Sequence, residues 1–388
     1  RCRSAFTAET GITRPPRAAG EPGWEDWLAF HRRSYEAYAR AYLEAVHQRK
    51  PGCLVCINWA YSARQPDPVT LPVDFLSGDF SHAWGVERTA VEARVLATGE
   101  GSHAGWHFKT VAHLCQEVAE VIANGGAVCV YIHPPRSGHL VSWEHEVVAE
   151  VARFCRARQV VAQGSVSLPQ AVVLHSRSHY YAHNDPLYGP GQATQPLEGA
   201  LHALLDTGKH VDMQTEEGLR ERLAAYELVV VAEQDPLADS VVEELTHYVQ
   251  QGGRLVLSGA HLARQPGLAA LAEVEAAGEP RQGFHYLPVD GAAVTVAGPW
   301  QPVRLRDATA WAALLYGPEP GKHDAGTPAI TLRESGRGRV AAIHGPIFAT
   351  YYRTRYPRLR SLLRQLFRAV WPDPMVELAA PAHVVLTL

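Results

Sequence analysis

Short apolar runs alternate along the chain with longer stretches whose apolar residues recur at helical spacing. The first long stretch, residues 24–48, carries Arg, Glu and His on its other face, and Pro51-Gly52 ends it. Three strand-like runs follow, ending near residues 59, 79 and 133, and each is separated from the next by enough residues for a helix. This alternation of strand and helix is typical of a parallel α/β fold.

The alternation restarts after residues 163–169, which we interpret as a linker. Helices are expected over residues 82–98, 109–123, 144–158, 197–207, 240–250 and 358–370, and strands over 171–176, 228–232, 252–258, 340–344 and 382–388, with one more around Val211. The second series predicts a doubly wound sheet of the flavodoxin-like type. We therefore expect three parts: residues 1–162, 168–372, and 373–388 as the start of a C-terminal β domain.

Polar and aromatic residues follow the predicted strands of the first part, a pattern that indicates a carbohydrate-processing (β/α)₈ barrel. Barrel enzymes carry their chemistry where strands end, so these residues become pocket candidates: Asn58, Trp59, Asp79, Trp106, Tyr131 and His133. Asp79 is the strongest candidate for acid/base chemistry, because the preceding glycine permits a close approach; capping the next helix is an equally good alternative. The aromatic rings offer platforms for a sugar or pack in the core, and Asn58 binds a hydroxyl or simply ends its strand.

A glycine-rich link at residues 99–105 contains a second candidate acid. Glu100 could swing over a pocket as a general acid, although an exposed loop glutamate usually faces solvent. Both interpretations stay open.

The composition argues against nucleic acids and anionic membranes as binding partners. The 388 residues are 46% hydrophobic and 20% charged with a net charge of -4, and no block of Lys or Arg indicates binding to nucleic acid or an anionic membrane. No apolar run approaches the roughly 20 residues that a membrane span needs. Residue 1 is Arg rather than Met, so we expect the natural N-terminus upstream; the compartment stays open, with the cytoplasm favoured.

Neither cysteines nor histidines predict a metal or cofactor site. Cys53 and Cys56 lie inside a strand-like run without a second pair at zinc spacing. His175, His179 and His183 have the spacing of helical metal ligands, but we expect them in a loop, where that spacing has no geometric meaning.

Several motifs of the first 160 residues together resemble bacterial α-L-fucosidase-like glycoside hydrolases. They are Cys2-Arg3-Ser4-Ala5-Phe6, Asn58-Trp59-Ala60-Tyr61, Asp74-Phe75-Leu76-Ser77-Gly78-Asp79, Gln116-Glu117 and Asn124-Gly125-Gly126. The second part resembles the β-galactosidase trimerisation-type domain, with a class I glutamine-amidotransferase-like fold, on residues 227–231 and 248–256. The turn at Ser258 lacks the nucleophilic Cys of an amidotransferase, so glutamine hydrolysis is not expected.

The resemblance implies a retaining glycosidase acting on a carbohydrate, whose barrel this chain contains only in its C-terminal part. It implies a nucleophilic Asp upstream of residue 1, no cofactor, and a homo-oligomer formed through the second domain. An acid is also expected near His103, so His103 is either a substrate contact or a sign of lost activity. The alternatives are a β-galactosidase and a non-catalytic carbohydrate-binding or assembly protein.

Overall fold

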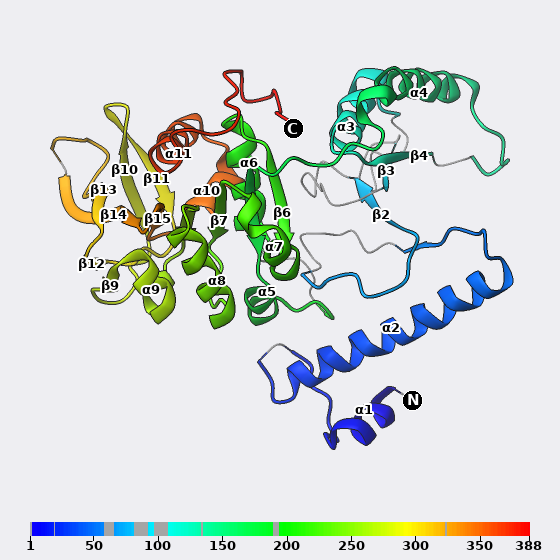
Figure 1. Cartoon of the computed structure of the whole chain (residues 1–388), viewed down its shortest axis with the longest axis horizontal. Helices are drawn as coiled ribbons and strands as arrows, with labels where there is room; N and C mark the ends of the chain where they lie inside the picture. Colours follow the sequence, from blue (N-terminus) through cyan, green and yellow to red (C-terminus); the bar gives the residue numbers. More distant parts are fainter. Residues whose placement is uncertain are drawn as a thin grey trace. The chain divides into compact units, whose positions relative to one another are not determined.

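The computed structural model of the protein describes residues 2–18, 20–57, 66–80, 92–96, 108–132, 135–188, 194–322 and 324–388, with the backbone alone at 78–80, 92–96 and 324–325. The chain forms two compact units. The first comprises Arg1–Gln65 and Val69–Ser167, and the second comprises Pro66–Pro68 and Leu168–Leu388. Figure 1 shows their elements.

The first unit begins with two helices, α1 (Cys2–Thr10) and α2 (Trp24–Arg49). Phe6 of α1 is fully buried, and its ring centroid lies 4.7 Å from that of Trp27 and 5.5 Å from that of Phe30. These edge-to-face contacts fasten the short helix to the long one. The helix predicted over residues 24–48 is confirmed.

Four parallel strands of the first unit form a sheet in the order β1-β2-β3-β4, and their bounds are β1 Cys56–Ile57, β2 Phe75–Phe80, β3 Glu92–Leu96 and β4 Ala127–Tyr131. The helix predicted over residues 82–98 is wrong at its end, where β3 lies. Five residues are too few to separate the two periodicities, and pairing with β2 on one side and β4 on the other decides for the strand.

Helices α3 (Val111–Ala123) and α4 (Ser142–Ala162) cover one side of β4, and both helices were predicted from the sequence. Their buried core comprises Leu114, Val118, Val121 and Val151, and Val128 and Val130 of β4 pack against it. The intervening strand residues Ala127, Cys129 and Tyr131 are exposed on the other side. One face of β4 is therefore covered and the other is open.

The second unit is built on a nine-stranded sheet in the order β11-β10-β13-β14-β15-β8-β7-β5-β6. Its parallel strands are β5 (Ala171–His175), β6 (Val211–Thr215), β7 (Leu228–Ala232), β8 (Arg254–Ser258) and β15 (Gly338–Ile343). Numbered along the chain, they run 2-1-3-4-5, the order of flavodoxin-like sheets. The predicted α/β fold with a parallel core is confirmed.

Helices cover both faces of this parallel core (Figure 1). One layer contains α7 (Glu216–Arg222), α8 (Asp239–Gln250) and α9 (Pro266–Ala272), and the other contains α6 (Gln195–Asp206), α10 (Ile347–Thr354) and α11 (Pro357–Val370). The short helices α5 (Arg177–His183), η3 (Leu223–Ala225) and η4 (Leu262–Arg264) lie in connections. Strands β5 and β7 are buried at every position, which explains their uninterrupted apolar sequence.

Antiparallel strands extend the parallel core beyond β15. They are β14 (Asp324–Ser335), β13 (Thr309–Leu315), β10 (Phe284–Val289) and β11 (Ala292–Ala297), while β9 (Val274–Ala276) and β12 (Val303–Leu305) form a separate pair. The sheet is therefore mixed.

The strand predicted over residues 382–388 is wrong. After Val370 the chain forms neither helix nor strand, and it stays within the second unit, where the Leu388 carbonyl accepts a hydrogen bond from Leu168 N at 3.2 Å. Residues 382–388 are apolar enough for a strand, but in the described part of the chain they pair with no other strand, and an apolar run without a hydrogen-bonded neighbour forms no sheet.

Gly199 marks the close crossing of α6 and α10. A Cβ there would lie 2.0 Å from the carbonyl oxygen of Phe348. We expect Gly199→Ala to lower the free energy of unfolding of the second unit by about 1–3 kcal/mol through overpacking, despite the better helix propensity of alanine. Urea denaturation measures the change, and Gly218→Ala in α7 is the control, because the closest contact of its Cβ would be the movable Gln214 side-chain amide. Unchanged or increased stability of Gly199→Ala would contradict the expectation.

Candidate functional site

The carboxyl ends of β1 to β4 lie along one edge of the first sheet, because all four strands are parallel. In the strand register Asp79 pairs with Arg94, Arg94 with Cys129, and Leu96 with Tyr131. The backbone thus places Asp79 and Tyr131 near the same edge. This is the edge at which α/β barrels carry their active sites.

Two of the eight candidate residues lie within the described part of the chain. Asp79 is the penultimate residue of β2, and only its backbone is described. Tyr131 is the last residue of β4, is 41% exposed and lies on the open side of that strand. The other six lie outside the described residues: Asn58, Trp59, Glu100, His103, Trp106 and His133. Their roles stay predictions.

Asp74, which the sequence singled out only as part of a motif, connects the starts of two strands. Asp74 Oδ2 accepts a hydrogen bond from Val55 N at 2.7 Å and lies 2.8 Å from His47 Nε2. The hydrogen bond from Val55 N, followed by that from His47, lowers the pKa of Asp74. The contact joins the end of α2 to the segments that enter β1 and β2.

A buried ion pair lies beside α3. Lys109 Nζ is 2.8 Å from Glu117 Oε1 and 2.9 Å from Oε2, and the two residues are 7% and 6% exposed. His113, one turn before Glu117, places Nε2 3.3 Å from Oε1. The sequence carried a signal, since Glu117 interrupts the apolar stripe of the helix.

The interpretation of the three histidines of the second unit is corrected by the structure. His179 and His183 lie in the helix α5, which begins because Ser176 Oγ accepts a hydrogen bond from His179 N. Their rings stack 4.3 Å apart, and His179 Nδ1 is 2.8 Å from the Asp235 carbonyl oxygen. Burial lowers the pKa of His179 and favours its neutral form.

The described ranges contain no group of three residues able to hold a metal ion. Cys53 and Cys56 are free and exposed thiols. In the same ranges, no helix combines the length and apolar character of a membrane span.

Glu233 is a perturbed acid at the carboxyl end of the second sheet. It follows β7, and its carboxylate accepts hydrogen bonds from Phe348 N at 2.7 Å and Ala349 N at 3.2 Å, in the first turn of α10. Desolvation of the carboxylate outweighs these two donors and raises the pKa of Glu233 to about 8. Sequence reasoning missed this residue, because its partner helix is more than a hundred residues away.

The raised pKa of Glu233 predicts a pH-dependent stability. In the folded state Glu233 keeps its proton up to about pH 8, whereas in the unfolded state it loses the proton near pH 4.5. The free energy of unfolding is therefore highest below pH 4.5 and falls as the pH rises towards about 8. A shift of one pKa unit corresponds to about 1.4 kcal/mol of unfolding free energy, and the partial exposure of Glu233 to water makes the effect smaller than that. We expect the free energy of unfolding to fall by about 2 kcal/mol in total. Urea denaturation at pH 5 and pH 9 tests this. Glu233→Gln should flatten the difference, whereas an equal pH dependence in both proteins would contradict the assignment.

The fold of the chain is similar to the folds of several glycoside hydrolases of known structure. The α-L-fucosidase isoenzyme 2 from Paenibacillus thiaminolyticus superposes with a TM-score of 0.76 at 16% identity, over 96% of this chain and 59% of that one. A cold-adapted β-galactosidase from Rahnella sp. R3 gives 0.69 at 16% identity over 94% and 65%. A GH42 β-galactosidase from G. stearothermophilus gives 0.67 at 14% identity over 95% and 62%.

The chain therefore spans about three fifths of the length of these enzymes. No family model and no curated protein sequence matches it. At such identities the relation is one of fold, and it extends over both units.

Proposed function

We propose that the protein is a retaining glycoside hydrolase that removes terminal sugars, with α-L-fucosides as its substrates. The observation that carries the proposal is the superposition on an α-L-fucosidase over 96% of the chain. The parallel strand edge that contains Asp79 supports it, since barrel glycosidases work at such an edge.

A retaining glycosidase needs a nucleophilic carboxylate and an acid/base carboxyl group roughly 5–5.5 Å apart. We assign the acid/base role to Asp79, with Glu100 as the competing candidate, and place the nucleophile outside the described residues. Tyr131 lies on the open side of β4, where its ring suits the apolar face of a sugar. The remaining proposed substrate contacts are Asn58, Trp59, His103, Trp106 and His133.

For the second unit we propose an amidotransferase-like, trimerisation-type domain that assembles copies of the protein. Its flavodoxin-like strand order supports that class. The turn after β8 begins Ser258-Gly259, without the cysteine that glutamine hydrolysis requires. With glutamine hydrolysis set aside, we propose that the second unit has a structural role in a homo-oligomer.

A β-galactosidase is the second candidate, because superposed structures over 94% and 95% of the chain bear that name. Hydrolysis of aryl α-L-fucoside and aryl β-galactoside by the full product of the gene separates the two. Preference for the fucoside supports the proposal, and preference for the galactoside replaces its substrate. Turnover of neither, together with retained binding of a free sugar, would establish the non-catalytic carbohydrate-binding alternative.

A further inference from the structure

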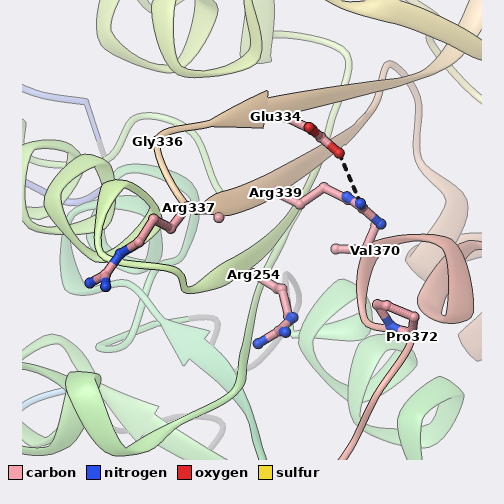
Figure 2. A pocket seen from close by; sticks show the side chains of 8 residues that line it. Arg254, Glu334, Gly336, Arg337, Arg339, Val370 and Pro372 are labelled. Carbon is pink, nitrogen blue, oxygen red and sulfur yellow. Dashed lines mark hydrogen bonds and ion pairs between the residues drawn. The ribbon is translucent and has the colours of Figure 1, made fainter.

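Three arginines surround a small pocket at the amino-terminal edge of the second sheet (Figure 2). The pocket has a volume of about 160 Å³ and is lined by Arg254, Glu334, Gly336, Arg337, Gly338, Arg339, Val370 and Pro372. At roughly 30 Å³ per water molecule, it has room for a small ion and some water. It lies where β8 and β15 begin, away from the carboxyl edge of the same sheet.

The strand register places two of these arginines next to each other on the same face of the sheet. Arg254 of β8 pairs with Arg339 of β15, and Arg339 pairs on its other side with Glu334 of β14. Paired residues on adjacent strands point to the same face, about 4.8 Å apart. Arg254, Arg339 and Glu334 therefore begin from adjacent positions in one row across the three strands.

The three arginines of the pocket differ in how many hydrogen-bond acceptors their side chains find. Arg339 Nη2 donates to Glu334 Oε1 at 2.9 Å, and its Nη1 donates to the Ala369 carbonyl oxygen at 2.5 Å. Arg337 donates to the Gln251 carbonyl oxygen at 2.9 Å and extends away from the other two in Figure 2. Within the described part of the chain, no residue accepts a hydrogen bond from the Arg254 side chain.

The hairpin between β14 and β15 holds the pocket rigidly. Gly336 has a φ of +60°, and a Cβ on it would lie 2.7 Å from the Gln250 carbonyl oxygen. A Cβ on Gly338 would lie 2.1 Å from the Val249 carbonyl oxygen. The turn is thus pressed against the end of α8, and the guanidinium groups start from a fixed backbone.

We propose that this pocket binds a tetrahedral oxyanion, a sulfate or phosphate group, between Arg254 and Arg339. Arg337 points away towards Gln251, so Arg254, Arg339 and Glu334 leave one positive charge in excess, which an oxyanion offsets. Guanidinium groups bind such oxygens through paired N–H donors. The group arrives either as the free ion or as an ester on a sugar.

Calorimetric titration of sodium sulfate into the 388-residue chain at constant ionic strength tests the proposal. We expect sulfate-specific binding that Arg254→Gln weakens about tenfold or more, because hydrogen bonds between charged groups are lost. Arg254→Lys, which keeps one charge, should fall between. Arg358→Gln is the matched control, since it removes an exposed arginine about 18 Å along α11 from Val370.

Each outcome of the sulfate titration supports or overturns the proposal. Sulfate binding to Arg254→Gln within twofold of the unmodified protein overturns the proposal, as does an identical heat with chloride. Circular dichroism confirms that each variant is folded. Tighter binding of galactose 6-sulfate than of free sulfate assigns the site to a sugar ester, whereas equal or weaker binding assigns it to the free ion; both support an oxyanion site.

Discussion

Replacing Glu117 with glutamine is expected to lower the free energy of unfolding of the first unit by about 3–5 kcal/mol, because the variant leaves the buried Lys109 ammonium without a countercharge. The pair is enclosed beside the core of α3 and α4, so water does not readily replace the carboxylate. Hydrogen–deuterium exchange of α3 in increasing urea reports the local stability. Glu146→Gln, at an exposed position of α4, is the control and should change it little.

The double variant Lys109→Met/Glu117→Leu separates pairing from packing. Replacing both charges with apolar side chains of similar size is often close to neutral. We therefore expect the double variant to recover most of the stability that Glu117→Gln loses. If it is as unstable as the single variant, packing of the two stems rather than charge pairing governs this site.

Asp79→Asn should lower turnover of an aryl glycoside by about 10²–10⁴-fold in the full product of the gene, because the amide cannot donate or accept the proton of the leaving oxygen. The loss should be smaller for a dinitrophenyl glycoside, whose leaving group departs without protonation. The ratio of the two losses identifies acid catalysis, which a merely structural defect would not produce. Asp373→Asn, in the tail of the second unit, is the matched control.

Glu100→Gln distinguishes the competing assignment. If Glu100→Gln shows the dependence on the leaving group and Asp79→Asn shows uniform loss, the acid/base role belongs to Glu100. Asp79 would then act in substrate binding or at the end of β2.

The spacing of apolar residues was enough to predict a strand where every residue of the strand is buried. Leu228–Ala232 is enclosed on both faces, so its apolar run could be assigned as a strand from sequence alone. Glu92–Leu96 has no such run, and its strand conformation comes from pairing between β2 and β4; both were predicted as strands, but local spacing does not show that a third strand lies between them. The residues of α5 looked like a loop because the capping role of Ser176 was not recognised.

The polar contacts were less accessible than the elements. Asp74 forms hydrogen bonds with His47 and Val55, and Glu233 accepts hydrogen bonds from the first turn of α10. Neither set of contacts can be predicted from local sequence spacing. The edge that gathers Asp79 and Tyr131 was predictable, because parallel strands bring their ends together. Its chemistry depends on side-chain placement that periodicity does not encode.

The open side of β4 makes Cys129 a reporter of anything that comes to cover that face of the sheet. Its thiol is exposed between Ala127 and Tyr131, whereas inward-facing strand residues of a completed eight-stranded barrel are packed in layers. A maleimide should therefore label Cys129 quickly when this face is open and slowly when another segment or another chain covers it. Because Cys2, Cys53 and Cys56 are also exposed, peptide mapping of the label is needed to read the rate at Cys129 alone.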